Sequence, residues 1–241
     1  MQLNKNIRHF LDLLRFSYFP LPDSEKSRYM AKIKRKVAHY QPLIEVRTGV
    51  DLGTITVKEY RFSIDDFFGM TKPKTKAARM IIKPLFELYR MFQEESLNLA
   101  ACSKNGAIYV PFGITTKSHI LWQKHAPDKV IDHTDESVVH ELSHFLFRKL
   151  GKSDSLKNES LSVILKGSEW EEGFASYCAQ TLFLDFYPDR CIVRNSGDLP
   201  KGYERGMHKI EKIIELRGKD ALFEVPKRWK EFEKELIDYK S

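Results

Sequence analysis

The chain of 241 residues contains little cysteine and no long uninterrupted hydrophobic run. Its cysteines are odd in number and none belongs to a C-x-x-C pair, so neither a disulfide framework nor a cysteine zinc knuckle is predicted. Arg8, Asp12 and Arg15 interrupt the apolar positions near the N-terminus, and no later run approaches the length of a membrane span. We therefore expect a soluble, unsecreted protein of the reducing cytoplasm that has no membrane partner.

Internal repeats and low-complexity tracts are equally absent, while hydrophobic residues make up 42% of the chain. That share lets the chain bury a core as one large domain or two small lobes, so a metal ion is not needed merely to fold it. The formal net charge of +7 is spread over many lysines and arginines rather than gathered in one block. Such a distribution favours an acidic partner only weakly.

The first half of the chain combines helical and strand patterns. Hydrophobic spacing on one face predicts amphipathic helices over residues 5–18 and 24–39, and residues 76–99 also have a helical pattern. Alternating apolar and polar side chains predict a strand over 52–62, and a second strand is predicted over 107–112. These strands indicate a small N-terminal lobe built partly from a sheet.

The second half has an almost wholly helical pattern. It predicts one helix over 132–150, a polar connection through Gly167 and a second helix over 169–186. Two more helices close the chain, and the first of them is expected to end near Gly218. The predicted fold class is therefore α+β, with a small strand-bearing N-terminal lobe and a mainly helical C-terminal lobe.

A metal-binding motif lies within the helix predicted over 132–150, where the chain reads His140-Glu141-Leu142-Ser143-His144. His140 and His144 are about one turn apart, so both imidazoles project from one face and can reach a single ion at roughly 2.0–2.1 Å. Glu141 lies one step around the helix, beside such an ion but not on it. That placement suits a base that takes a proton from zinc-bound water, whose pKa the metal lowers towards roughly 7. The alternative is a helix that carries two histidines by accident.

A catalytic zinc needs a third protein ligand and one open position. The segment Trp170-Glu171-Glu172-Gly173 offers a candidate at a predicted helix start. Gly173 is unfavourable inside a helix, which makes sense if its missing side chain lets the backbone approach the motif helix, so that Glu172 reaches the metal. The alternative is that Glu171, Glu172 and the nearby Glu169 are ordinary first-turn acids that complement the helix dipole.

These segments resemble the gluzincin metallopeptidases, in which H-E-x-x-H is followed downstream by a glutamate ligand in an E-G-x-A segment. Glu172-Gly173-Phe174-Ala175 matches that segment, and Tyr203-Glu204-Arg205-Gly206 is similar to the Y-E-K-G segment of aminopeptidase-like gluzincins. The resemblance implies one zinc ion, a general base and a donor that stabilises the oxyanion. The corresponding residues are His140, His144 and Glu172 as ligands, Glu141 as the base and Tyr203 as the donor.

The resemblance also implies an enzyme that cleaves peptides or proteins in a zincin-like cleft between the two lobes. The strand residues Ile108, Tyr109 and Val110 occupy the place of the edge strand that lines the gluzincin cleft, where they would bind an extended substrate. No G-x-M-E-N segment precedes the motif helix, so the usual anchor for a substrate amino terminus is missing. We therefore expect an endopeptidase rather than an aminopeptidase.

The predicted domain organisation follows the same resemblance. An N-terminal helical segment, residues 1–45, precedes one catalytic domain, residues 46–241. Within that domain the upper lobe covers residues 46–131 and the lower, helical lobe covers residues 132–241.

The chain departs from the gluzincin pattern on both sides of the predicted third ligand, Glu172. Ser176 stands four residues after Glu172, where some relatives have an aspartate that orients a zinc-binding histidine. A partner of that kind must come from elsewhere, and Glu136, one turn before His140, is the candidate. The connection from His144 to Glu172 is also long, so it must contain an extra loop or short helix.

Two interpretations from other classes remain open at this level. The chain could be a non-catalytic binding or regulatory protein that kept a metallopeptidase fold, although a purely structural zinc would need no base such as Glu141. It could also bind nucleic acid through its basic residues 32–36, although a solvated helix face is the simpler interpretation of these residues. Salt-dependent binding to DNA would separate the two interpretations of the basic residues.

Overall fold

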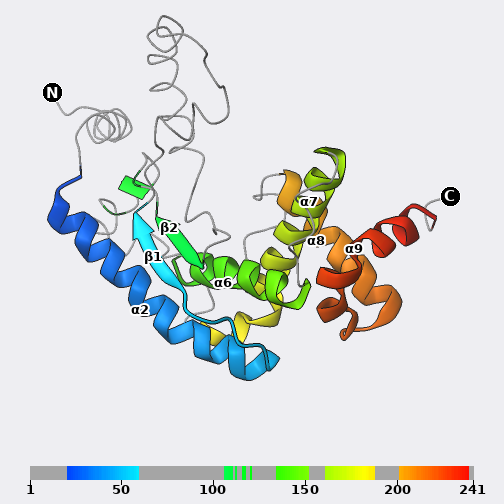
Figure 1. Ribbon diagram of the computed structural model, residues 1–241, viewed down its shortest axis with the longest axis horizontal. Helices are drawn as coiled ribbons and strands as arrows, with labels where there is room; N and C mark the ends of the chain where they lie inside the picture. Colours follow the sequence, from blue (N-terminus) through cyan, green and yellow to red (C-terminus); the bar gives the residue numbers. More distant parts are fainter. Residues whose placement is uncertain are drawn as a thin grey trace, which may run out of the picture. The chain divides into compact units, whose positions relative to one another are not determined.

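The computed structural model describes residues 21–59, 106–110, 112, 116–117, 120, 134–151, 161–187 and 201–238. Within these residues the chain is mostly helical and has one small parallel sheet of two strands, as expected for an α+β protein (Figure 1). The chain forms two compact units, which we describe separately. The first contains residues 1–32 and 56–131, and the second contains residues 33–55 and 132–241. The helices predicted over 5–18 and 76–99 lie outside the described residues.

Helix α2 spans Asp23–Thr48 and is longer than the predicted helix over 24–39. Its buried face continues the predicted spacing, because Tyr29, Ile33 and Val37 are followed by Tyr40 and Ile44 in the core. The boundary predicted between residues 45 and 46 falls inside this helix, and the division into those two segments stays a prediction.

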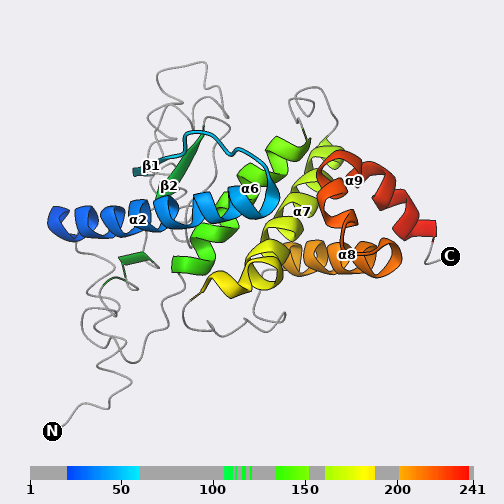
Figure 2. The same ribbon diagram turned by 90° about the horizontal axis from the view of Figure 1, so that it is seen from below.

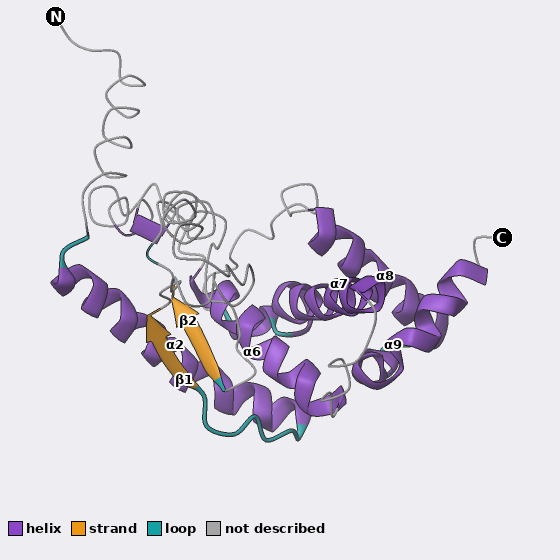
Figure 3. Cartoon of the chain, turned by 45° about the horizontal axis from the view of Figure 1, so that its top comes forward, coloured by secondary structure: helices purple, strands orange, loops and turns teal. Residues whose placement is uncertain are grey.

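The sheet consists of β1, Thr56–Glu59, and β2, Ala107–Val110, which run parallel with Val57 opposite Ile108 (Figure 3). Strand β1 begins four residues later than the predicted strand over 52–62, and residues 60–62 lie outside the described residues. Gly53 has a positive φ of 77°, and the side chain of Gln41 donates a hydrogen bond of 2.7 Å to its carbonyl, so this stretch is bound to α2 and has no strand conformation. The strand therefore begins only at Thr56.

Four helices dominate the second unit: α6, Thr134–Gly151; α7, Leu161–Tyr177; α8, Lys201–Arg217; and α9, Ala221–Asp238 (Figure 2). Helix α6 confirms the predicted helix over 132–150 to within two residues, and it buries Val138, Leu142 and Leu146 completely. Helix α8 ends as predicted at Gly218, whose φ is 87° and whose amide donates to the Ile214 carbonyl at 2.8 Å.

Helix α7 corrects two sequence predictions. The helix was expected to start near residue 169 after a polar connection through Gly167, but it begins at Leu161. Gly167 lies inside the helix. A Cβ atom there would lie 3.3 Å from the ring of Trp229 on α9, so the glycine leaves space for this ring. The helical path then continues beyond Tyr177 as a π-helical turn, Cys178–Leu182, and a 3-10 turn, Leu184–Phe186.

None of the helices in the described residues is both long enough and apolar enough to cross a membrane. The predicted cytoplasmic location stays a prediction.

Candidate metal centre

Helix α6 presents His140 and His144 on one face. The residues are four apart, so their side chains lie one above the other along the helix. Their Nε2 atoms are 3.2 Å apart, and their rings meet edge to face with centroids separated by 4.8 Å. His144 is buried, whereas the side chain of His140 is 16% exposed. The pair is therefore partly open to an incoming ion or water molecule.

Glu172 of α7 completes a three-donor cluster with these imidazoles. Its Oε2 atom lies 3.3 Å from Nε2 of His140 and 3.5 Å from Nε2 of His144. The three donor atoms thus form a nearly equilateral triangle. A tetrahedral zinc site with ligand distances of about 2.0–2.1 Å places its donors about 3.3–3.4 Å apart. The observed triangle matches one face of such a tetrahedron.

The charges of this cluster also suit a cation. Burial raises the pKa of Glu172, but the two neighbouring imidazoles outweigh that effect and hold its pKa well below the usual range. Glu172 is therefore an anion next to two imidazole nitrogens, and its buried Oε2 has no partner with good hydrogen-bond geometry in the described residues. Burial lowers the pKa of His140, which favours the neutral imidazole that a metal requires. Burial acts in the same direction on His144, but its contacts with Glu171 and Glu172 outweigh burial and raise its pKa to about 10, so a metal ion must displace a proton from this ring.

Glu141 lies next to the cluster and is buried. It is only 6% exposed, and its Oε2 atom has no hydrogen-bond partner within the part of the chain that is described. Burial is the main reason why its pKa rises to about 8. A carboxyl group whose pKa lies near neutrality can accept and return a proton, as general acid–base catalysis requires.

Tyr203 of α8 also borders the cluster. Its ring stacks on that of His140 with centroids 5.8 Å apart and an interplanar angle of 22°. Burial raises the pKa of Tyr203, and the negative charge of Glu172 raises it further. The phenol therefore keeps its proton and can serve as a hydrogen-bond donor.

A close contact between α7 and α8 positions Glu172 and Tyr203. A Cβ atom on Gly173 would lie 2.1 Å from the backbone carbon of Gly206, and a Cβ on Gly206 would lie 2.2 Å from the carbonyl oxygen of Glu169. Only two glycines permit this approach. The sequence prediction that Gly173 makes room for the motif helix was therefore wrong, because the backbone it admits belongs to α8.

The structure also excludes the interpretation of Glu171 and Glu172 as first-turn acids. Helix α7 begins at Leu161, so both residues lie about three turns into the helix, far from the positive end of the helix dipole. Glu172 contributes to the cluster instead, and Glu171 has a separate contact.

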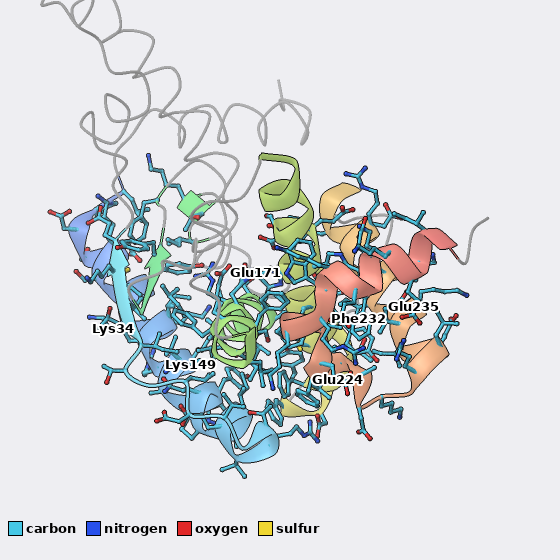
Figure 4. All side chains as sticks on the ribbon, turned by 45° about the vertical axis from the view of Figure 1, so that its right-hand side comes forward. Lys34, Lys149, Glu171, Glu224, Phe232 and Glu235 are labelled. Carbon is cyan, nitrogen blue, oxygen red and sulfur yellow. The ribbon has the colours of Figure 1, made fainter. Side chains whose placement is uncertain are left out.

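Sequence reasoning missed Glu171 and Arg148. Oε1 of Glu171 lies 3.1 Å from Nδ1 of His144 and accepts a hydrogen bond of 2.9 Å from Nε of Arg148. Figure 4 labels Glu171 among the side chains drawn on the ribbon. The available signal was the spacing, since Arg148 follows His144 by one helical turn and Glu171 precedes Glu172 directly. Glu136, the residue predicted to orient a histidine, accepts a hydrogen bond of 3.1 Å from Gln180.

Ile108, Tyr109 and Val110 lie in β2, within the first compact unit, whereas the whole three-donor cluster lies in the second. Ile108 and Val110 are fully buried. A role for these residues in binding a substrate stays a prediction.

Lys36 of the basic segment 32–36 contributes to packing. Lys36 forms an ion pair with Asp135 at the start of α6, and the hydroxyl of Tyr40 donates a hydrogen bond of 2.8 Å to the same carboxylate. Lys34 and Arg35 are exposed. Nucleic-acid binding by this segment stays a prediction. Lys36 already forms an ion pair within the protein.

No protein-family model matches the chain, and neither the curated proteins nor the solved structures contain a match to it.

Proposed function

We propose that the protein is a zinc-dependent peptidase with a gluzincin-like site. The observation that carries this proposal is the triangle formed by His140, His144 and Glu172, whose edges of 3.2, 3.3 and 3.5 Å suit tetrahedral zinc. Two histidines and one glutamate also match the ligand set of known zinc peptidases, which leaves a fourth position open for water or substrate.

Zinc in such a site acts as a Lewis acid and lowers the pKa of water to roughly 7. The residues of the chain itself then have separate tasks. Glu141, which is buried next to the cluster, takes the proton of the attacking water and passes it to the leaving amine. Tyr203 donates its hydroxyl proton in a hydrogen bond to the oxyanion that forms at the scissile carbonyl.

The finer parts of the proposal extend this chemistry to the substrate. We propose peptides or proteins as the substrates, internal cleavage rather than removal of amino-terminal residues, and a cleft between the two lobes as the binding site. The intact and buried Glu141 favours catalysis over a non-catalytic binding role, because a zinc ion that only stabilises the fold needs no base beside it.

The first test is the zinc content of protein purified without added metal, with elemental analysis as the measurement. We expect one zinc ion per chain in the wild type and in Glu141→Gln, and loss of zinc in His144→Ala and Glu172→Ala. His208→Ala is the matched control, because His208 is a histidine of α8 whose side chain is 77% exposed. A zinc-free wild type, or full zinc content in both ligand variants, would overturn the proposal.

The second test separates an enzyme from a binding protein. Zinc-loaded protein is incubated with a mixed peptide library, and the products are identified by mass spectrometry. The wild type should cleave internal bonds, and Glu141→Gln should lose at least about 100-fold in rate because the proton acceptor is gone. An unchanged rate in Glu141→Gln would refute the assigned role of this residue.

A further inference from the structure

Two successive carboxylates of α7 contact the two ring nitrogens of His144. Glu171 Oε1 lies 3.1 Å from Nδ1, and Glu172 Oε2 lies 3.5 Å from Nε2. Neighbouring residues of a helix point in directions about 100° apart, so their side chains can reach opposite edges of one imidazole ring. The ring is therefore held between two adjacent residues of a different helix.

Arg148 holds the first of these carboxylates. It follows His144 by four residues on α6 and therefore lies one turn further along the same face. Its Nε and Nη2 atoms lie 2.9 and 2.8 Å from the same Oε1 atom of Glu171 that faces His144. Two charged N–H donors on one oxygen keep Glu171 ionised and restrict its rotation.

We propose that Glu171, held by Arg148, is a positioning residue for the metal site, an inference that rests on the proposed function. A carboxylate at Nδ1 accepts a hydrogen bond from the N–H of that nitrogen and so favours the neutral tautomer in which Nε2 carries a lone pair. The contact also fixes the ring orientation, which directs this lone pair towards His140 and Glu172. Glu171 thereby takes the place of the aspartate that is missing four residues after Glu172.

A plain ion pair between α6 and α7 is the competing explanation for the same contacts. The protein contains a suitable control on the same helix, because Glu169 of α7 pairs with Lys209 of α8 at 3.2 Å. The side chains of Glu169 and Glu171 are 19% and 17% exposed, so their environments are comparable. The pair of Glu169 does not involve a residue of the metal cluster.

The test compares zinc affinity in Glu171→Gln, Glu169→Gln and the wild type, all in the full chain, by competition with a chromophoric chelator. We expect Glu171→Gln to bind zinc roughly 10–100-fold more weakly, because it loses the charge that orients His144. Glu169→Gln should bind zinc as the wild type does. The absorption spectrum of the Co²⁺-loaded protein should change in Glu171→Gln and remain unchanged in Glu169→Gln.

Wild-type zinc affinity in Glu171→Gln overturns the inference, and so does an equal loss in both glutamine variants, since that indicates a general loss of stability. If the wild type itself binds no zinc, the proposed function fails, and this result is distinct from the other two. Should Glu171→Gln not fold, as judged by circular dichroism, Arg148→Lys serves as the second variant. This variant keeps the positive charge but loses the two N–H contacts of Arg148 with Glu171, so we expect it to bind zinc more weakly. Unchanged zinc affinity in this variant would overturn the inference.

Discussion

Burial and neighbouring charge act in opposite directions on two carboxyl groups of the same cluster. For Glu141, burial outweighs the nearby charges of His144 and Arg148, and its pKa rises to about 8. Glu172 is also mostly buried, but the two imidazoles next to it keep its pKa below the usual range. The surroundings of the two residues therefore suit the different roles proposed for them, a proton acceptor and an anionic ligand.

The raised pKa of Glu141 predicts a pH-dependent stability difference in the metal-free protein. Between the ordinary pKa of 4.5 and the folded value of about 8, the folded chain binds more protons than the unfolded chain, so its stability falls as pH rises. Glu141→Gln lacks this titration. The variant should match the wild type most closely below pH 4.5 and become relatively more stable as pH rises to about 8, by up to several kcal/mol.

Urea unfolding of both metal-free proteins over this pH range measures the difference. Glu204→Gln on the exposed side of α8 provides the control, and we expect its free energy of unfolding to run parallel to that of the wild type. A constant difference between Glu141→Gln and the wild type would show that Glu141 does not titrate in this window.

At the scale of elements, the paired glycines of α7 and α8 determine where the site residues lie. Gly173 follows Glu172 directly, and Gly206 follows Tyr203 by three residues. The contact between these glycines therefore brings Glu172 and Tyr203 to the same place. The ion pairs of Lys209 with Glu169 and with Glu233, at 3.2 and 2.8 Å, join α7, α8 and α9 around this contact.

Gly206→Ala should strongly destabilise the fold. Its methyl group would lie 2.2 Å from a backbone oxygen, which cannot move aside as a flexible side chain does. We expect a loss of at least about 3 kcal/mol in the free energy of unfolding, measured by urea denaturation. Gly218→Ala is the control, since its Cβ would meet open space and only the positive φ of 87° is unfavourable. A smaller loss in Gly206→Ala than in Gly218→Ala would contradict the predicted close approach.

At the scale of the whole molecule, every residue proposed to bind the metal or to take part in catalysis lies in the second compact unit. His140 and Glu141 come from α6, Glu172 comes from α7, and Tyr203 comes from α8. A metal ion that bridges α6 and α7 binds the folded state and has no matching site in the unfolded chain. The proposed function therefore predicts that metal binding stabilises this unit.

Removal of zinc with a chelator should accordingly lower the melting temperature of the protein. At free zinc about 1,000-fold above the dissociation constant, binding contributes about 4 kcal/mol to the free energy of unfolding. Differential scanning calorimetry with and without zinc measures the shift. His144→Ala should melt at the same temperature in both conditions, and an equal zinc-dependent shift in this variant would show that the ion binds elsewhere.

Local spacing predicted a considerable part of the fold and of the candidate site. The four-residue interval of His140 and His144 requires only that α6 be helical, and the helical pattern there is strong. The end of α8 at Gly218 follows from the preference of glycine for positive φ. The parallel pairing of β1 with β2 did not follow, because nothing in either short strand specifies its partner or direction.

The sequence by itself determined which residues share a helix face, because that depends on backbone geometry within a few residues. It also singled out Glu172 through a known motif. Only the tertiary structure decided that Gly173 admits Gly206 rather than the motif helix, and that Glu171 and Arg148 meet at His144. These contacts join residues 23 to 33 positions apart, so they depend on how whole helices pack, which no local pattern encodes.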